Sequence, residues 1–220
     1  MIRGVTRAEA AKRREENEIE FSRIVAFSDG VFSIAITLLV LNLAIDPPVP
    51  ADELWHALGE QWEHLVSYAI SFAVIARFWL NHHRFFGEVT AFDGRLIGLN
   101  MLYLGFIVLI PFSSQVLGEY GGETPAIVVY AVNLAAVVVI GYVMFVDALR
   151  AGLTRIDEHT QREGLVRAGF IASVFLVSIP VALIDPHIAP FCWLTLFFDP
   201  TKRIVGEDEG GDEGDPKPFA

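Results

Sequence analysis

The chain has 220 residues, of which 53% are hydrophobic, and its mean hydropathy is positive. A soluble domain of this length rarely carries several apolar runs that are each long enough to cross a bilayer. The formal net charge is −11, and the single cysteine excludes an internal disulfide. We therefore predict an all-α polytopic membrane protein with six transmembrane helices at residues 23–45, 61–82, 94–117, 125–149, 165–184 and 187–199. The last run is short and has the length of a partial span.

The two ends of the chain differ from this apolar middle. Residues 1–22 are highly charged, and we expect an amphipathic or disordered cytosolic segment there. The transmembrane domain is predicted to occupy residues 23–204. Residues 205–220 are acidic and have nothing to bury, so a disordered C-terminal tail is expected.

The first predicted helix carries a carboxylate, Asp29, inside an apolar run. Such a group costs roughly 2.5–3.5 kcal/mol on insertion scales, so it must face protein or water and marks a candidate functional site. At about 100° per residue, Asp29 lies opposite a stripe of apolar side chains, and Thr37 lies about 60° to one side of that stripe. The stripe consists of Phe27, Ile34, Leu38, Leu41 and Ile45, below which Arg23 continues it. Ordinary helix packing would produce the same stripe.

The remaining segments contain recognisable signals. Two consecutive prolines, Pro47 and Pro48, should end the first helix. The acidic stretch 51–60 fits either a short surface helix or a solvated loop. Pro111 predicts a kink in the third helix. The fourth helix has few polar residues, and we predict that it is peripheral and faces lipid.

Lysine and arginine are distributed unevenly among the loops. They lie before the first predicted helix, between the second and third, between the fourth and fifth, and after the sixth. The other loops carry acidic residues instead. The positive-inside rule therefore places both termini in the cytoplasm and requires an even number of spans.

Three motifs resemble one known family. They are Arg23-x-x-x-Phe27-Ser28-Asp29 with the following Ile34, Thr37, Leu38 and Leu41; Trp79-Leu80-Asn81-His82-His83; and Pro111-Phe112. Together they resemble the transmembrane protein 175 family, the endolysosomal potassium channels and their bacterial relatives. The resemblance implies a homotetramer in which the first helix lines a central pore.

The resemblance also implies roles for individual residues. Ile34, Leu38 and Leu41 would form stacked apolar rings that act as gate and filter, and Thr37 would tune selectivity. A structural network would join Arg23, Phe27, Ser28, Asp29, Trp79 and one of the pair His82 and His83. The familiar T-V-G-Y-G potassium filter is absent, so side chains of a full helix would have to select the ion.

The expected function is a potassium-selective channel of the bacterial inner membrane that conducts passively. Its partners would be lipid, potassium ions and three further copies of the chain. No catalytic residue, metal site, cofactor or nucleic-acid partner is predicted, since His82-His83 is the only histidine cluster and no nucleotide or nucleophile motif occurs. Two rival hypotheses remain: a proton-permeable channel or ion-coupled carrier that uses Asp29 and the histidine pair, and an accessory membrane subunit without a pore.

Overall fold

The computed structural model describes residues 7–43, 49–155 and 158–197. All secondary structure in these ranges is helical, apart from one isolated bridge between Val89 and Thr154. The elements are α1 (Arg7–Leu38), which continues into the 3-10 helix η1 (Leu39–Asn42); α2 (Leu54–Glu60); α3 (Trp62–Glu88); α4 (Gly94–Val108); α5 (Ile110–Tyr120); α6 (Thr124–Arg150); α7 (Glu158–Ile184); and the 3-10 helix η2 (Ala189–Phe197). The all-α prediction is confirmed.

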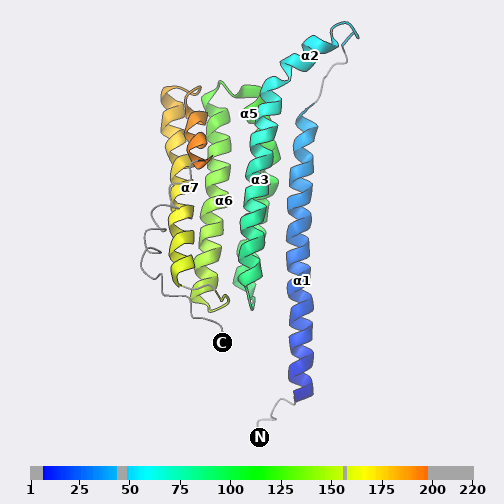
Figure 1. Cartoon of the computed structure of the whole chain (residues 1–220), viewed down its shortest axis with the longest axis vertical. Helices are drawn as coiled ribbons and strands as arrows, with labels where there is room; N and C mark the ends of the chain where they lie inside the picture. The colour runs from blue at the N-terminus through cyan, green and yellow to red at the C-terminus, as the bar shows by residue number, and fades with distance from the viewer. Residues whose placement is uncertain (1–6, 44–48, 156–157, 198–220) are drawn as a thin grey trace, which may run out of the picture.

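The long helices stand side by side and alternate in direction (Figure 1). Four segments are long and apolar enough to cross a membrane, namely Glu18–Asn42, Gly94–Tyr120, Thr124–Arg150 and Gly164–Ile184. Helix α3 has 27 residues and also runs the height of the bundle, although Arg77 and Arg84 make it more polar. Helix η2 has nine residues, so at about 2 Å per residue it is shorter than a bilayer core. The sixth predicted span is therefore a partial span.

Helix α1 differs from its predicted start. It begins at Arg7, so the expected boundary between residues 22 and 23 falls inside one continuous helix that extends beyond the other helices (Figure 1). Residues 7–22 contain alanine, arginine, lysine and glutamate but no glycine or proline, and such a segment favours a helix although most of its residues are polar. At the other end the α-helix stops at Leu38, and the predicted proline stop lies outside the described residues.

The third predicted helix is interrupted as Pro111 indicated. Helix α4 ends at Val108, and α5 begins at Ile110 with Pro111 in its first turn, where the missing N–H is not required. The backbone oxygen of Pro111 accepts a hydrogen bond from Asn42 Nδ2 at 3.2 Å. This contact ties the end of η1 to the break.

The prediction that the fourth span is peripheral is wrong. This span is α6, which lies in the middle of the bundle and packs against α4, α5 and α7. Small residues on its buried face, among them Ala126, Ala131 and Ala135, let the neighbouring helices approach closely. An apolar sequence suits protein and lipid neighbours equally, so hydropathy alone did not locate this helix.

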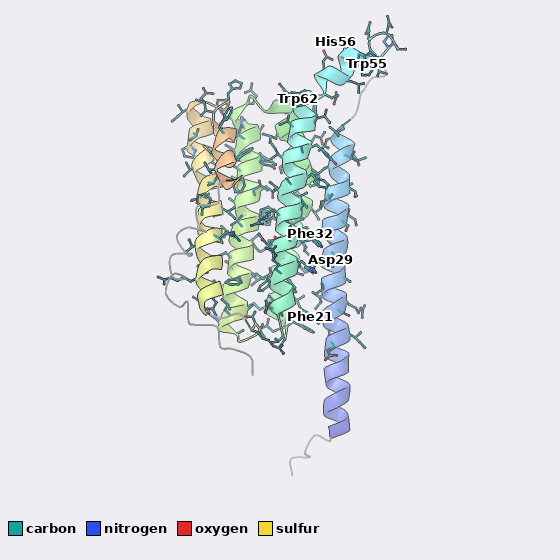
Figure 2. All side chains as sticks on the ribbon, in the orientation of Figure 1. Phe21, Asp29, Phe32, Trp55, His56 and Trp62 are labelled. Atoms are coloured by element: carbon teal, nitrogen blue, oxygen red, sulfur yellow. The ribbon has the colours of Figure 1, made fainter. Side chains whose placement is uncertain are left out.

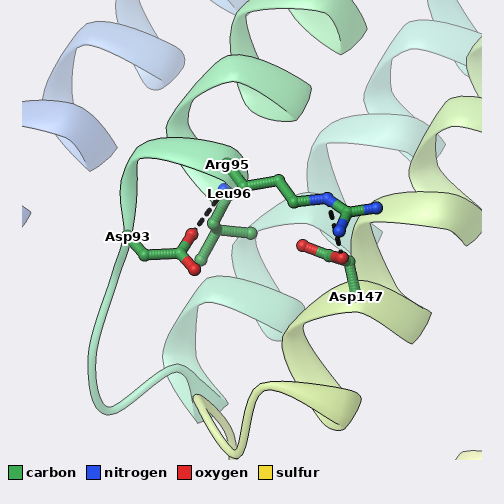
Figure 3. A network of polar contacts seen from close by, with 4 residues as sticks. All are labelled: Asp93, Arg95, Leu96 and Asp147. Carbon is green, nitrogen blue, oxygen red and sulfur yellow. Dashed lines mark hydrogen bonds and ion pairs between the residues drawn. The ribbon is translucent and has the colours of Figure 1, made fainter.

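At one end of the bundle, which we call the bridge end, two loops are joined by hydrogen bonds. The Val89–Thr154 bridge joins the loop after α3 to the loop after α6, and Thr90 N donates to Leu153 O at 2.8 Å. Asp93 caps α4 by accepting from Leu96 N at 2.8 Å, and Arg95 pairs with Asp147 of α6 at 3.0 Å (Figure 3). A small apolar cluster stabilises this end, and it includes Phe86, Leu96 and Met144 with Phe21 and Ile24 of α1.

Candidate functional site

Helix α1 has one packed face and one free face. Ser28, Phe32, Ala35 and Leu39 are buried against the bundle with at most 1% of their surface exposed. On the other side Phe27, Ile34, Leu38 and Leu41 are 55%, 59%, 38% and 69% exposed. The described part of the predicted apolar stripe therefore lies on one continuous, exposed face, which we call the free face, and Ile45 lies outside the described residues.

Small and hydroxyl residues flank this stripe, and Gly30, Ser33 and Thr37 are all exposed. Thr37 Oγ1 donates to the carbonyl oxygens of Ile34 at 2.9 Å and Ser33 at 3.0 Å. Its proton is thus held by its own helix, whereas its lone pairs remain free to accept. A hydroxyl in this state can offer an oxygen to a cation but has no spare donor for an anion.

The acid in α1 has a defined partner. Trp79 Nε1 of α3 donates a hydrogen bond to Asp29 Oδ1 at 2.9 Å, and both side chains are half-buried. Figure 2 shows Asp29 and Phe32 on the side of α1 that faces the bundle. The carboxylate is therefore engaged between α1 and α3 and does not lie on the apolar stripe.

A second, deeper set of contacts joins three helices. Asn100 Nδ2 of α4 donates to Ser28 Oγ of α1 at 3.0 Å, and Asn100 Oδ1 lies 2.9 Å from His82 Nε2 of α3. Ser28 Oγ in turn donates to Ile24 O at 2.9 Å. All three side chains are at most 3% exposed, so Asn100 sits at the centre of a buried polar chain.

Aromatic rings surround the polar side chains of this set. His82 stacks on Phe86 with 4.4 Å between the ring centroids and meets the edge of Phe32 at 5.3 Å. Buried polar groups of this kind are costly to leave without a hydrogen-bond partner. The arrangement should therefore hold the packed face of α1 in one register against α3 and α4.

Known proteins resemble this chain in both sequence and fold. A family model described as the endosomal/lysosomal potassium channel TMEM175 matches residues 23–111, which include the free face of α1, Trp79, His82 and Asn100. A crystal structure of a TMEM175 homolog from Chamaesiphon minutus superposes with a TM-score of 0.66 at 27% identity, covering 87% of this chain and 99% of that one. The chain belongs to the TMEM175 family.

Curated TMEM175 relatives carry two kinds of name. A Streptomyces collinus protein named a potassium channel is 40% identical over 136 residues, 62% of this chain and 66% of its own. Another from Chamaesiphon minutus, also named a potassium channel, is 41% identical over 103 residues, 46% of this chain and 51% of its own. A Gallus gallus protein named an endosomal/lysosomal proton channel is 37% identical over 111 residues, 46% of this chain and 22% of its own. The matches thus span two thirds or less of these relatives, which are named as channels and not as enzymes.

The structure brings together only part of the TMEM175 network expected from the motifs. Asp29 meets Trp79 directly, whereas Ser28 reaches His82 through Asn100. His83 is exposed and stacks on Trp79 with centroids 5.4 Å apart. Two expected members, Arg23 and Phe27, are exposed, and Arg23 has no hydrogen bond or ion pair within the described residues. The functional roles of all these residues stay predictions.

Asn100 belongs to this network but to none of the three motifs, so it was not predicted. Its position within an apolar span was a signal in the sequence, since a buried asparagine needs hydrogen-bond partners on neighbouring helices. The sequence does not indicate which helices those are, because the partners lie 18 and 72 positions away. Among the described residues, no group of three or more histidine, cysteine or acidic side chains is placed to hold a metal ion.

The geometry around Asp29 predicts different effects for two substitutions. Asp29→Asn keeps an acceptor for Trp79 Nε1, so we expect a folded protein with little loss of stability. Asp29→Leu leaves that N–H unpaired and should cost about 1–3 kcal/mol. Thermal unfolding in detergent measures both. Equal destabilisation by the two variants would show that the negative charge matters and that the hydrogen bond does not.

Proposed function

We propose that the chain is a potassium-selective channel that conducts passively through a pore lined by α1 from four copies. The observation that carries this proposal is the continuous free face of α1, with apolar side chains at Ile34, Leu38 and Leu41 and the hydroxyl of Thr37 beside them. The names of the bacterial relatives support potassium as the permeant ion.

Four copies would turn this face into stacked rings. The axial distance from Ile34 to Leu41 is about 12 Å, at 1.5 Å per residue in α1 and about 2 Å per residue in η1, so three rings fit within the second half of the span Glu18–Asn42. Rings of methyl groups replace little of an ion's hydration, and a narrow apolar ring closes a pore by dewetting. Under this proposal Ile34, Leu38 and Leu41 form the gate, and the lone pairs of Thr37 favour a partly dehydrated cation.

Proton conduction is the second candidate, because the animal relatives are named proton channels. A relay needs titratable groups through the depth of the membrane. On α1 and η1 the stretch from Gly30 to Asn42 contains none, and His82 is buried behind Phe32. This observation favours potassium over a side-chain proton relay. An accessory subunit without a pore remains the rival from another functional class.

Current through planar bilayers under bi-ionic conditions tests the proposed selectivity. With potassium on one side and sodium on the other, the reversal potential should lie toward the potassium equilibrium potential. A reversal potential that instead follows an imposed pH gradient would support the proton channel. The absence of any current from well-folded protein would support the accessory subunit.

Thr37→Val should weaken selectivity. The substitution keeps the shape of the side chain but removes the oxygen whose lone pairs face outward. We expect the reversal potential to move toward zero while assembly is retained. Ser173→Val is a matched control, because Ser173 also donates to its own helix, at Phe170 O, and is exposed on α7 far from α1. An unchanged potential for Thr37→Val would remove Thr37 from the filter.

We further propose that the bridge end faces the cytoplasm of a bacterial inner membrane. Arg84, Arg95, Arg150 and Arg155 lie at that end, and the described residues of the opposite end, which we call the α2 end, contain no lysine or arginine. The positive-inside rule assigns the basic end to the cytoplasm. The orientation of the C-terminus, which we expect on the same side, depends on residues outside the described ranges.

Labelling of single cysteines checks this orientation. In a Cys192→Ser background, an impermeant maleimide applied to intact cells should label Asp52→Cys at the α2 end. Glu88→Cys at the bridge end should be labelled only after the cells are opened. Labelling of both positions in intact cells would contradict the assignment.

A further inference from the structure

Helix α2 extends beyond the bundle and exposes large aromatic side chains. It runs obliquely away from the end of α3 and past the end of η1, with few contacts to the rest of the chain (Figures 1 and 2). Trp55 is 85% exposed and Trp62 is 68% exposed. Clustered exposure of this kind marks a surface that contacts something other than water.

The residues of α2 and the first turn of α3 divide into three sides. Gln61 separates the two helices, because its backbone angles, φ −75° and ψ 3°, lie outside the α-helical region, so a step of about 100° per residue applies within each helix separately. In each helix one side is apolar and exposed, and we call these residues together the apolar arc: Leu54, Trp55 and Leu58 on α2, and Trp62, Leu65 and Val66 on α3. The opposite arc is polar and contains His56, Glu60 and Glu63.

The third side faces the protein. Ala57 is 8% exposed, and Gln61 Oε1 and His64 Nδ1 are buried as well. His64 lies so close to α5 that a side chain at Gly118 would come within 2.8 Å of its Nδ1 atom. The contact of His64 with α5 therefore orients the first turn of α3, and on α2 Ala57 is the buried residue.

We propose that this apolar arc rests in the headgroup layer of the membrane at the α2 end, where the two tryptophans act as interfacial anchors. Tryptophan favours this layer because its ring is apolar and its indole N–H is polar. The inference rests on the membrane placement of the chain and not on the ion that it conducts.

Continuity with the membrane face of α3 supports lipid as the occupant. The arc includes Trp62, Leu65 and Val66 in the first turns of α3, and Phe72, one to two turns further along α3, is also 41% exposed. The charge pattern narrows the kind of lipid, because acidic residues flank the arc and no basic residue accompanies them. A zwitterionic headgroup, which has no net charge, is therefore favoured over an anionic one.

Depth-resolved fluorescence quenching tests the anchor in the full-length chain. A bimane probe is attached at Trp55→Cys or, as the matched control on the polar arc, at His56→Cys, both in a Cys192→Ser background. The protein is reconstituted in phosphatidylcholine vesicles that contain a headgroup spin-labelled lipid, and iodide serves as the aqueous quencher. We expect the ratio of lipid to iodide quenching to be several-fold higher at Trp55→Cys than at His56→Cys.

Three results would overturn the proposal. Equal quenching of both positions by iodide would place α2 in water. Protection of Trp55→Cys from both quenchers would show that protein, such as a second copy, covers the arc. Stronger lipid quenching when phosphatidylglycerol replaces part of the phosphatidylcholine would contradict the preference for an uncharged headgroup, for which we expect a decrease.

Discussion

Ile34→Asn is expected to increase the potassium leak through the reconstituted protein by about tenfold or more and to weaken its selectivity. Ile34 is 59% exposed on the free face of α1, in the second half of the span Glu18–Asn42. Asparagine has a similar volume but offers water two donors and an acceptor, so an apolar ring would become wettable. A lowering of the barrier by 1.4 kcal/mol corresponds to about a tenfold change in rate. Stopped-flow flux from potassium-loaded vesicles measures the change.

A matched control separates this effect from general damage. Leu176 on α7 is 52% exposed and lies on the far side of the bundle from α1. Leu176→Asn therefore introduces the same group on an equally exposed apolar surface without touching the proposed pore. Unchanged flux in both variants, with both folded, would show that the free face of α1 contacts lipid or protein and lines no pore.

Asn100→Leu is expected to cause the largest loss of stability. Asn100 is fully buried, and its removal leaves the partners Ser28 and His82 without their hydrogen bonds across the helix interfaces. Each orphaned buried group costs about 1–3 kcal/mol. We expect a lower unfolding temperature and a weakened attachment of α1, both measurable by thermal unfolding and limited proteolysis in detergent.

Two further variants test whether Ser28, Asn100 and His82 stabilise the fold together. Asn81→Leu makes the same chemical change at a half-buried position of α3 and should be nearly neutral. In a double-mutant cycle, Ser28→Ala combined with Asn100→Leu should cost less than the sum of the single changes, because both remove the same contact. Strict additivity would mean that Ser28 and Asn100 stabilise the fold independently.

Much of the fold followed from the sequence, because hydropathy, proline positions and charge asymmetry are local signals. The start of α3, the break beside Pro111 and the short η2 segment all lie close to the predicted positions. The two faces of α1 were also predictable, because a period of 3.6 residues separates Asp29 from Ile34 whatever the neighbours are.

The features that the sequence did not yield depend on tertiary contacts. Helix α6 was placed at the periphery because an apolar helix in a bundle and one in lipid have the same composition. Asn100 was overlooked because its partners are distant in sequence. The continuous helix from Arg7 was not predicted, because the charged segment before residue 23 was expected to be a separate amphipathic or disordered cytosolic segment, although its residues favour a helix.

Potassium flux through vesicles that contain only this protein tests the central claim most directly. Vesicles loaded with potassium and diluted into a potassium-free solution should lose the ion down its gradient without any coupled proton or sodium movement. A protonophore is added to balance the charge, so that a proton, carried by the protonophore and not by the protein, enters for each potassium ion that leaves. The account predicts potassium efflux well above that of empty vesicles, with sodium efflux much slower under the same conditions. Folded, reconstituted protein that releases neither ion faster than empty vesicles would contradict it.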